Sequence, residues 1–298
     1  MKNLDQFRQN SFIEIKGIDS VGFLNSLITN DCHILNETTS IYTCLLSPQG
    51  KYLHDFILIK TPTGLLIDIT TKQKDIFLKR LNLYKLRSKV DIIDTENTWS
   101  LAYIDPLQAS YLSKLLEFPL NIGIKVGQTL YHHHYGFFVT DPRHIDLGIR
   151  WIYPASMFVD KFSPFFLNQD QYEMKRISRA IPSSDRDLIP DKSLPLENNF
   201  DELGAINWKK GCYIGQEVTA RMKYKNAARK KLYTVRLETR LTSGAYKILT
   251  SAGHEAGELF SIHQNIGLAL LRLEFLNTKE QFFVESELGR VLVYPLNF

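Results

Sequence analysis

Apolar and polar positions before residue 229 alternate between strand-like and helix-like spacing. Residues 12–17 alternate and end in a glycine, which predicts a strand and a turn. Apolar residues over 21–28 recur at helical spacing and predict a helix, with Asp19 or Ser20 as its N-cap. The segment 47–51, Ser-Pro-Gln-Gly-Lys, separates two apolar runs and predicts a hairpin turn. Further strands are predicted over 65–69, 90–93, 99–104, 136–139 and 148–153, and further helices over 76–84, 108–116 and 169–180.

The chain after Lys230 shows a different pattern. Short apolar runs alternate with turn residues, and no segment has convincing helical spacing. The runs cover 232–237, 246–249, 266–272 and 291–294. This spacing predicts a small all-β barrel or sandwich. The preceding part predicts an α+β fold with antiparallel sheets.

Composition favours a folded protein with a slight positive charge. Of the 298 residues, 44% are hydrophobic and 12% aromatic, enough for a substantial core. The net charge of +4 does not by itself require nucleic acid. Many of the lysines and arginines are, however, concentrated between residues 209 and 231. They are Lys209, Lys210, Arg221, Lys223, Lys225, Arg229, Lys230 and Lys231. This cluster is either a solvated face or a basic rim for an anionic ligand or acidic partner, with a nucleic-acid-binding module over 209–231 as a weaker alternative.

The cysteines and the N-terminus bear on the cellular compartment. The chain has three cysteines, Cys32, Cys44 and Cys212. Because their number is odd and no CxxC motif occurs, neither a disulfide framework nor a structural zinc site is indicated. A reducing compartment is expected. Residues 1–7 have no apolar targeting core, and no apolar run reaches the length of a membrane span. We expect a soluble cytosolic protein of bacterial type, or a mature form already processed.

Residues 210–221, KGCYIGQEVTAR, are the most distinctive segment. They follow neither the helical nor the strand period. Their two glycines permit tight turns and a close approach of the backbone. Around the glycines lie a thiol, a phenol, an amide, a carboxylate and cations. The candidate site residues in this segment are Lys210, Cys212, Tyr213, Gln216, Glu217 and Arg221.

The chemistry of Cys212 leaves two interpretations open. Neighbouring cations favour a thiolate and hence a reactive thiol, whereas free cysteine is also among the most buried residue types. A nucleophilic hydrolase is weakly supported, because no local pattern ties a histidine base to Cys212. An iron–sulfur cluster needs four ligands, so a partner, another protomer or a small thiol would have to supply the rest.

Two further groups have both a chemical and a structural interpretation. The run 132–134 is His-His-His and begins a metal site or lies in a solvated loop. Asp141 and Arg143 share one turn, where they either recognise a heterocycle with adjacent donors and acceptors or form an internal ion pair that braces the turn.

Taken together, the segments resemble the YgfZ-type folate-binding proteins, which are bacterial and mitochondrial iron–sulfur assembly factors related to the T-protein, the aminomethyltransferase of the glycine cleavage system. The 210–221 segment is similar to that family's KGCY-x-GQE motif. Other similar segments, in the family's order, are 23–31, LLSPQGK at 45–51, YKLRSKV at 84–90, Asp141-Pro142-Arg143 with Gly148 and Arg150, 172–182 and 195–197. Ala180 and Asn226 stand where family members often have glycine. Asparagine tolerates the left-handed conformation better than most residues.

This resemblance implies a three-lobed, T-protein-like α+β cloverleaf. Two interleaved lobes would occupy 1–228 and a C-terminal all-β barrel 229–298. Tetrahydrofolate or a related folate would bind in a central funnel, with Tyr172, Asp141, Arg143 and Arg221 as cofactor-binding residues. A pterin needs a flat apolar wall and a few polar groups, and its glutamate tail favours a cationic rim.

The resemblance also implies a function. Cys212 would be the functional thiol, with Lys210, Tyr213, Gln216 and Glu217 beside it, in the assembly or repair of [4Fe–4S] proteins. Expected partners are iron–sulfur assembly proteins or client [4Fe–4S] enzymes, with a transient cluster shared through Cys212. No membrane partner is expected, and nucleic acid is unlikely, although the family has been tied to tRNA modification. The compartment would be the bacterial cytoplasm, or the mitochondrial matrix for a processed eukaryotic precursor.

One alternative is a folate-dependent aminomethyltransferase or demethylase. The T-protein's catalytic aspartate has no recognisable counterpart in this sequence. This difference favours an accessory factor without independent turnover.

Overall fold

The computed structural model describes residues 10–157, 159–242, 244–276, 280–287 and 289–296. The chain forms two compact units, each built from separated segments. Unit 1 contains the described residues up to Leu46 together with Leu53–Tyr172 and Leu203–Ile214. Unit 2 contains Ser47–Tyr52, Glu173–Glu202 and the described residues from Gly215 onward.

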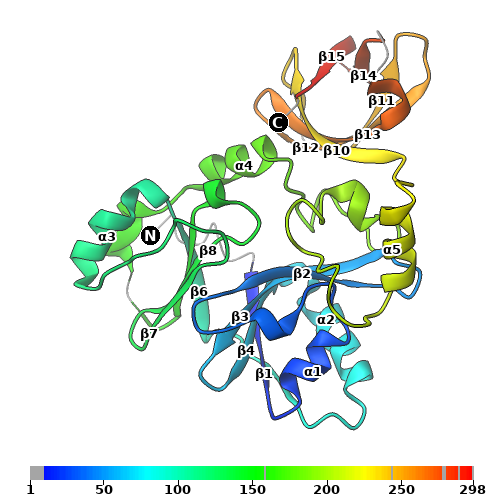
Figure 1. The fold of residues 1–298 in the computed structure, drawn as a ribbon. Coiled ribbons are helices and arrows are strands. Elements are labelled where there is room, and N and C mark those ends of the chain that lie inside the picture. The colour runs from blue at the N-terminus through cyan, green and yellow to red at the C-terminus, as the bar shows by residue number, and fades with distance from the viewer. Residues whose placement is uncertain (1–9, 158, 243, 277–279, 288, 297–298) are drawn as a thin grey trace. The chain divides into compact units, whose positions relative to one another are not determined.

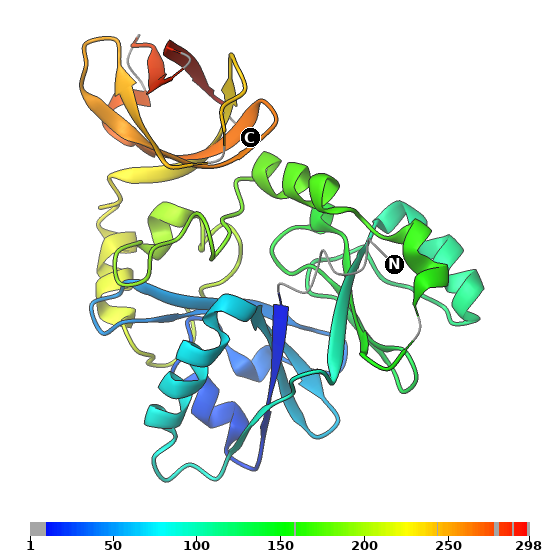
Figure 2. The ribbon, with the colours of Figure 1, turned by 180° about the vertical axis from the view of Figure 1, so that it is seen from behind.

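The first sheet has five strands in the order β2-β3-β4-β1-β5. Its strands are β1 (Asn10–Lys16), β2 (Ile41–Leu46), β3 (Tyr52–Thr61), β4 (Gly64–Thr70) and β5 (Asp91–Asp94). The short helix α1 (Ser20–Asn25) follows β1, and α2 (Thr71–Lys85) covers one face of the sheet (Figure 2). Alternation along β1 places Ile13 and Ile15 in the core, where they join Phe77 and Leu81 from successive turns of α2.

The second sheet of unit 1 has four strands in the order β6-β9-β8-β7. They are β6 (Trp99–Ile104), β7 (Thr129–His132), β8 (Gly136–Thr140) and β9 (Ile149–Pro154), and α3 (Ala109–Leu116) packs with them (Figure 1). Trp151 is fully buried at the centre of this core and stacks on Phe138, with ring centroids 5.3 Å apart. The pairs β1–β4 and β8–β9 are both antiparallel, as predicted.

The C-terminal part of unit 2 is a closed barrel in the order β10-β13-β12-β11-β14-β15. Its strands are β10 (Lys230–Leu237), β11 (Tyr246–Thr250), β12 (Glu255–His263), β13 (Ile266–Arg272), β14 (Phe282–Ser286) and β15 (Gly289–Pro295). The expectation of no helix here is wrong, because a single turn, α6 (Leu273–Leu276), follows β13. A four-residue helix is too short to show an apolar period.

Two further helices connect the sheets and the barrel, namely α4 (Gln169–Ser178) and α5 (Gln216–Tyr224). Short 3₁₀ turns occupy Cys32–Ile34, Pro106–Gln108, Ile145–Leu147, Asp160–Phe165 and Pro195–Asn198. Ala180 has φ +49° just after α4, and Asn226 has φ +47° just after α5. Both lie in the left-handed region that glycine adopts most readily. These backbone angles give a physical reason for glycine at the matching positions of the family pattern.

The α+β class, the antiparallel sheets and the C-terminal barrel are therefore confirmed. The division at residues 228 and 229 stays a prediction. None of the helices in the described part of the chain combines the length and the apolar character needed to traverse a bilayer. The expectation concerning residues 1–7 falls outside the described residues.

Candidate functional site

The KGCY segment divides at Gly215 into a loop and a helix. Gly215 has φ +81° and occupies the N-cap position of α5. Gln216, Glu217 and Arg221 therefore lie on a helix, which the sequence did not predict because the segment shows no helical apolar period. Thr219 is the only buried residue of α5. A helix with so narrow a buried face leaves no clear apolar period in the sequence.

Lys210 anchors the loop in unit 1. Its side chain is buried, and Nζ donates hydrogen bonds to the backbone carbonyls of Asn25 (2.7 Å), Ile28 (2.7 Å) and Asn30 (2.6 Å). An ammonium has three protons to donate, so these carbonyls use all of them. Burial lowers the pKa of Lys210 to about 8. Lys210 thus fixes the loop to the chain after α1 and does not extend into a cationic rim.

The three cysteines occupy different environments. Cys32 and Cys44 are buried, whereas Cys212 is exposed. Burial raises the pKa of Cys32 to about 12 and raises that of Cys44 further. Both buried thiols are therefore held in the unreactive protonated form. Cys212 is the thiol that solvent, a ligand or a partner can reach.

Tyr213 follows Cys212 and turns in the opposite sense, into the protein. It is 7% exposed, and its hydroxyl has no hydrogen-bond partner among the described residues. Lys210 Nζ lies 5.2 Å from the centre of its ring, a cation–π distance. Burial raises the pKa of Tyr213. The buried side chains of Lys210 and Tyr213 therefore fix the backbone on both sides of the exposed Cys212.

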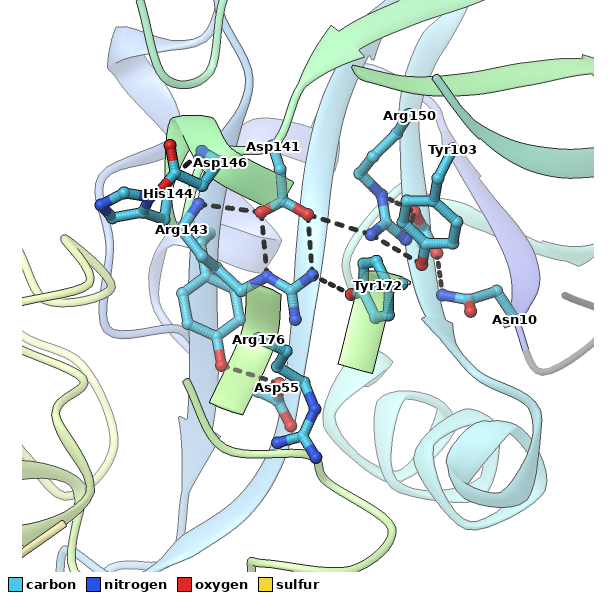
Figure 3. Close-up of polar contacts among 12 residues, drawn as sticks. Asn10, Asp55, Tyr103, Asp141, Arg143, His144, Asp146, Arg150, Tyr172 and Arg176 are labelled. Carbon is cyan, nitrogen blue, oxygen red and sulfur yellow. Dashed lines mark hydrogen bonds and ion pairs between the residues drawn. The ribbon is translucent and has the colours of Figure 1, made fainter. Parts of the chain in front are cut away.

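Asp141 and Arg143 form the internal ion pair that was one of the two expectations for this turn. Arg143 Nε and Nη2 donate to the two carboxylate oxygens of Asp141 at 2.9 and 2.7 Å (Figure 3). Nη2 also donates to the Tyr172 hydroxyl at 2.8 Å. Burial opposes ionisation of Asp141, but the guanidinium of Arg143 outweighs it and lowers the pKa of the carboxyl. The structure brings Asp141, Arg143 and Tyr172 together in unit 1.

Arg150 extends this network and was not among the predicted site residues. Its Nη1 donates to Asp141 at 3.2 Å and to the Tyr103 hydroxyl at 3.0 Å (Figure 3). Its Nε donates to Asp68 at 2.9 Å. The Tyr103 and Tyr172 rings lie 4.3 Å apart. Asp68 interrupts the apolar run of β4, and this buried carboxylate is the signal in the sequence that would have indicated a partner.

The predicted cationic cluster is partly neutralised by carboxylates. In unit 2, Lys223 pairs with Asp201 and Lys231 pairs with Glu202. Arg221, Lys225 and Arg229 are exposed in the same unit, and Lys209 is exposed in unit 1. These pairs favour the solvated-face interpretation for at least part of the cluster.

The histidine run follows the loop interpretation rather than a metal site. His132 ends β7, and 133–135 form the turn to β8. His132 stacks on Tyr135, with ring centroids 4.6 Å apart. Within the described ranges, no three His, Cys, Asp or Glu side chains are arranged to hold a metal ion.

Comparisons with known proteins show which families the chain resembles in sequence and in fold. Residues 229–294 match the CAF17 C-terminal beta-barrel domain. The chain is 28% identical over 291 residues to the mouse mitochondrial iron–sulfur cluster assembly factor IBA57, covering 89% of this chain and 76% of the mouse protein. The human IBA57 is also 28% identical, over 284 residues, covering 88% and 75%.

A mitochondrial IBA57 homologue of Neurospora crassa is 28% identical over 244 residues, or 77% of this chain, and the match spans about half (52%) of that longer protein. Among solved structures, the chain resembles the glycine cleavage system aminomethyltransferase T from Bartonella henselae. The TM-score is 0.77 at 14% identity, over 98% of this chain and 84% of that one. Such low identity shows the fold alone. The relatives and the fold together confirm the resemblance to iron–sulfur assembly factors related to the T-protein.

Proposed function

We propose that this protein is an accessory factor in the assembly or repair of iron–sulfur proteins and that Cys212 is its functional thiol. The observation that carries the proposal is the contrast among the cysteines, since Cys212 alone of the three is exposed. The relatives named as iron–sulfur cluster assembly factors support the same function. The loop that holds Cys212 is tied down by Lys210, so its thiol is presented at a defined place.

The cluster is cargo rather than a resident group. Cys212 supplies one thiolate, and a cluster requires about four ligands. The described residues offer no further set of converging ligands. We therefore infer that the remaining ligands come from an assembly protein or a client [4Fe–4S] enzyme, with Cys212 completing the set during transfer.

A folate fits the residues around Tyr172 in part. Tyr172 is half-buried and offers one aromatic wall, which suits a pterin ring. Asp141 is saturated by Arg143 and Arg150, so it would orient Arg143 rather than contact the ligand. In this proposal Tyr172 stacks on tetrahydrofolate and Arg143 donates to it, both from unit 1. Arg221 lies in unit 2, and its part in folate binding stays a prediction from the family resemblance. When bound, the folate would accept or donate a one-carbon unit.

The second candidate is a folate-dependent aminomethyltransferase or demethylase. The likeness of the fold to aminomethyltransferase T favours it. The lack of a recognisable counterpart to the T-protein's aspartate weighs against turnover. The relatives' names support the mitochondrial matrix over a bacterial cytoplasm as the compartment.

Replacing Cys212 tests the function directly. We expect Cys212→Ala to lower the activity of [4Fe–4S] enzymes in cells that depend on this protein, while the purified variant unfolds at the wild-type temperature because the side chain is exposed. Lys209→Ala, which removes the neighbouring exposed side chain, is the matched control and should leave these enzymes active. Wild-type [4Fe–4S] activities in the Cys212→Ala strain would refute the proposal.

Folate binding is tested by titrating the wild type, Tyr172→Ala and Tyr111→Ala with tetrahydrofolate. Binding is followed by the fluorescence of the three tryptophans. Loss of a stacked ring in Tyr172→Ala should weaken binding about tenfold. Tyr111→Ala removes a tyrosine that is 60% exposed in the same unit and serves as the control. Equal affinity of all three proteins would exclude Tyr172 from the folate site, and methylene-tetrahydrofolate production from methylamine donors would favour the transferase.

A further inference from the structure

The C-terminal end of α2 and the two turns beside it carry an exposed surface that the proposed function does not use. Three aliphatic side chains protrude from it, with exposed fractions of 84% for Ile18, 75% for Leu83 and 87% for Leu86. Isolated exposed aliphatics are ordinary, but a group of them marks an interaction site. We call this surface the α2 patch, and it consists of Ile18, Leu83 and Leu86 with Lys79, Lys85, Arg87 and Lys89.

The two turns of the α2 patch are held against each other. The backbone N–H of Lys89 donates to the Asp19 carboxylate at 2.7 Å. A side chain at Gly17 would place its Cβ 2.2 Å from the Lys89 carbonyl oxygen, so the two backbones are in contact. Ile18, between Gly17 and Asp19, is thereby fixed beside the segment that carries Leu86. The patch is a defined feature of unit 1 and not a chance group of loose side chains.

Leu86 occupies a backbone conformation that costs free energy. The Ser88 N–H donates to the Lys85 carbonyl at 2.8 Å and closes a four-residue turn. Leu86 is the second residue of this turn, with φ +42° and ψ −112°. These angles are close to those of the first central position in a type II′ turn, where glycine is the usual residue. A leucine is unfavourable in this conformation and, at 87% exposure, gains no burial in return, which is consistent with a role for the side chain outside the fold.

The charge around these aliphatics is strongly positive. Residues 71–89 contain seven lysines and arginines and a single carboxylate, Asp75. Lys74 is paired with Asp94 at 2.7 Å, whereas the cations of the α2 patch have no such carboxylate partner in the described part of the chain. A surface of this sign attracts acidic groups.

The outer face of α2 adds a concave element. A shallow hollow of about 560 Å³ lies beside the patch, lined by Asp75, Leu78, Lys79, Asn82 and Leu83. Leu83 belongs to both the hollow and the patch. A hollow of this size accommodates one or two side chains of a partner.

We propose that the α2 patch docks an acidic segment of a partner protein, whose aliphatic side chains pack on Leu83, Leu86 and Ile18 while its carboxylates meet Lys85, Arg87 and Lys89. This inference goes beyond the proposed function, because it uses no part of the Cys212 loop. Aliphatic anchors surrounded by complementary charge are the usual composition of a helix-in-groove or peptide interface.

The other two classes of ligand fit less well. Single-stranded nucleic acid is bound by aromatic stacking platforms, and the centre of this patch is aliphatic. An anionic membrane is a continuous surface and leaves the hollow unfilled, and it would also meet the carboxylate of Asp75, which lines that hollow. A peptide can fill the hollow with one of its side chains, and it can carry an uncharged residue opposite the Asp75 carboxylate.

Binding is measured with the full chain and a fluorescein-labelled helical peptide that carries glutamates on one face and leucines at i and i+4 on the other. Leu86→Gly relieves the unfavourable backbone angle and removes the protruding side chain. We expect this variant to unfold at a higher temperature than wild type and to bind the peptide about tenfold more weakly. Arg87→Glu should weaken binding by a similar factor and reduce its dependence on salt, because Lys79, Lys85 and Lys89 remain.

Leu107→Gly is the matched control, because Leu107 is 82% exposed on another surface of the same unit, and its peptide affinity should equal that of wild type. Three results would overturn the proposal. They are no peptide binding by the wild-type chain, equal affinities of Leu86→Gly and wild type, or tighter binding to phosphatidylserine vesicles or a single-stranded oligoribonucleotide than to the peptide. Because Cys212 is intact in every variant, none of these results bears on the iron–sulfur function.

Discussion

At the scale of single residues, burial decides which chemistry each side chain retains. His54 on β3 is 3% exposed, its Nδ1 lies 3.1 Å from the Gln73 side-chain oxygen, and its Nε2 has no partner among the described residues. Lys210 and Cys212 are two residues apart, yet one is buried and the other exposed. The sequence showed that both are chemically capable. It did not show that the lysine donates to carbonyls about 180 residues earlier, because that contact exists only after folding.

His54 makes the stability of the protein depend on pH. Burial lowers its pKa from 6.5 to about 4, so the unfolded chain takes up this proton before the folded one does. The free energy of unfolding should therefore fall as the pH drops from 6.5 to 4, by about 3 kcal/mol in total. Urea titrations at several pH values measure this slope.

His54→Asn should flatten the slope within this pH interval, since an amide keeps one polar contact but does not titrate. His133→Asn, at an exposed position in the histidine turn, should leave the slope as in wild type. A slope that is unchanged in His54→Asn would show that another group is responsible.

At the scale of elements, local patterns predicted most strands but missed β7, β12 and β14, and they did not show which charged side chains pair. The strands over 12–17, 65–69, 99–104 and 148–153 were visible because short apolar or alternating runs are recognisable within a few residues. The helix α5 was missed because Thr219 is its single buried residue, which leaves no apolar period in the sequence. The pairing of Arg150 on β9 with Asp68 on β4 was also missed, although both residues are charges inside apolar strands. Only the packing of the two sheets of unit 1 shows that these charges meet.

Among the contacts between strands, we expect the ion pairs of Arg150 to contribute most to the free energy of unfolding. Its guanidinium is 2% exposed and neutralises Asp68 and Asp141, which are fully buried. Arg150→Leu leaves Asp68 without its cation and leaves Asp141 with Arg143 alone, and it should lower the free energy of unfolding by about 3–5 kcal/mol. Arg150→Lys keeps the charge without the planar fork and should recover part of the loss.

Equilibrium urea unfolding measures both variants. The control is Arg290→Leu, since Arg290 is exposed and lies 3.8 Å from Glu285, a surface pair that contributes about 0–1 kcal/mol. If Arg150→Leu were as stable as Arg290→Leu, the buried network would have no net stabilising effect.

At the scale of the whole molecule, each unit is assembled from segments far apart in the chain. In unit 2 the barrel is tied to the 173–202 segment by Arg176, which is 2% exposed. Its guanidinium donates to Asp187 at 2.8 Å and to Ser261 Oγ on β12 at 2.9 Å. Asp187 in turn accepts from the Ser261 backbone N–H at 2.9 Å. The 173–202 segment and β12 are therefore joined through one buried ion pair.

Removing the centre of this link should loosen one segment of unit 2. Asp187→Ala deprives Arg176 and the Ser261 N–H of an acceptor, and we expect a loss of about 2–4 kcal/mol in the free energy of unfolding. Limited proteolysis should then cut earlier within 183–193. Asp191→Ala, at an exposed position in the same segment, should be cut at the wild-type rate. Equal proteolysis of the two variants would contradict this role for Asp187.

Sequence pattern alone was sufficient for most strands, most helices, the α+β class and the C-terminal all-β region, because an apolar period is set by residues only a few positions apart. It also singled out Cys212 and the Asp141–Arg143 turn, since unusual side chains stand out where no apolar period explains them. Tertiary structure alone decided that Cys212 is exposed, that Lys210 donates all its ammonium hydrogen bonds to backbone carbonyls, and that Asp141 is paired with two arginines. Exposure and hydrogen-bond partnership depend on groups distant in sequence, so no local pattern records them.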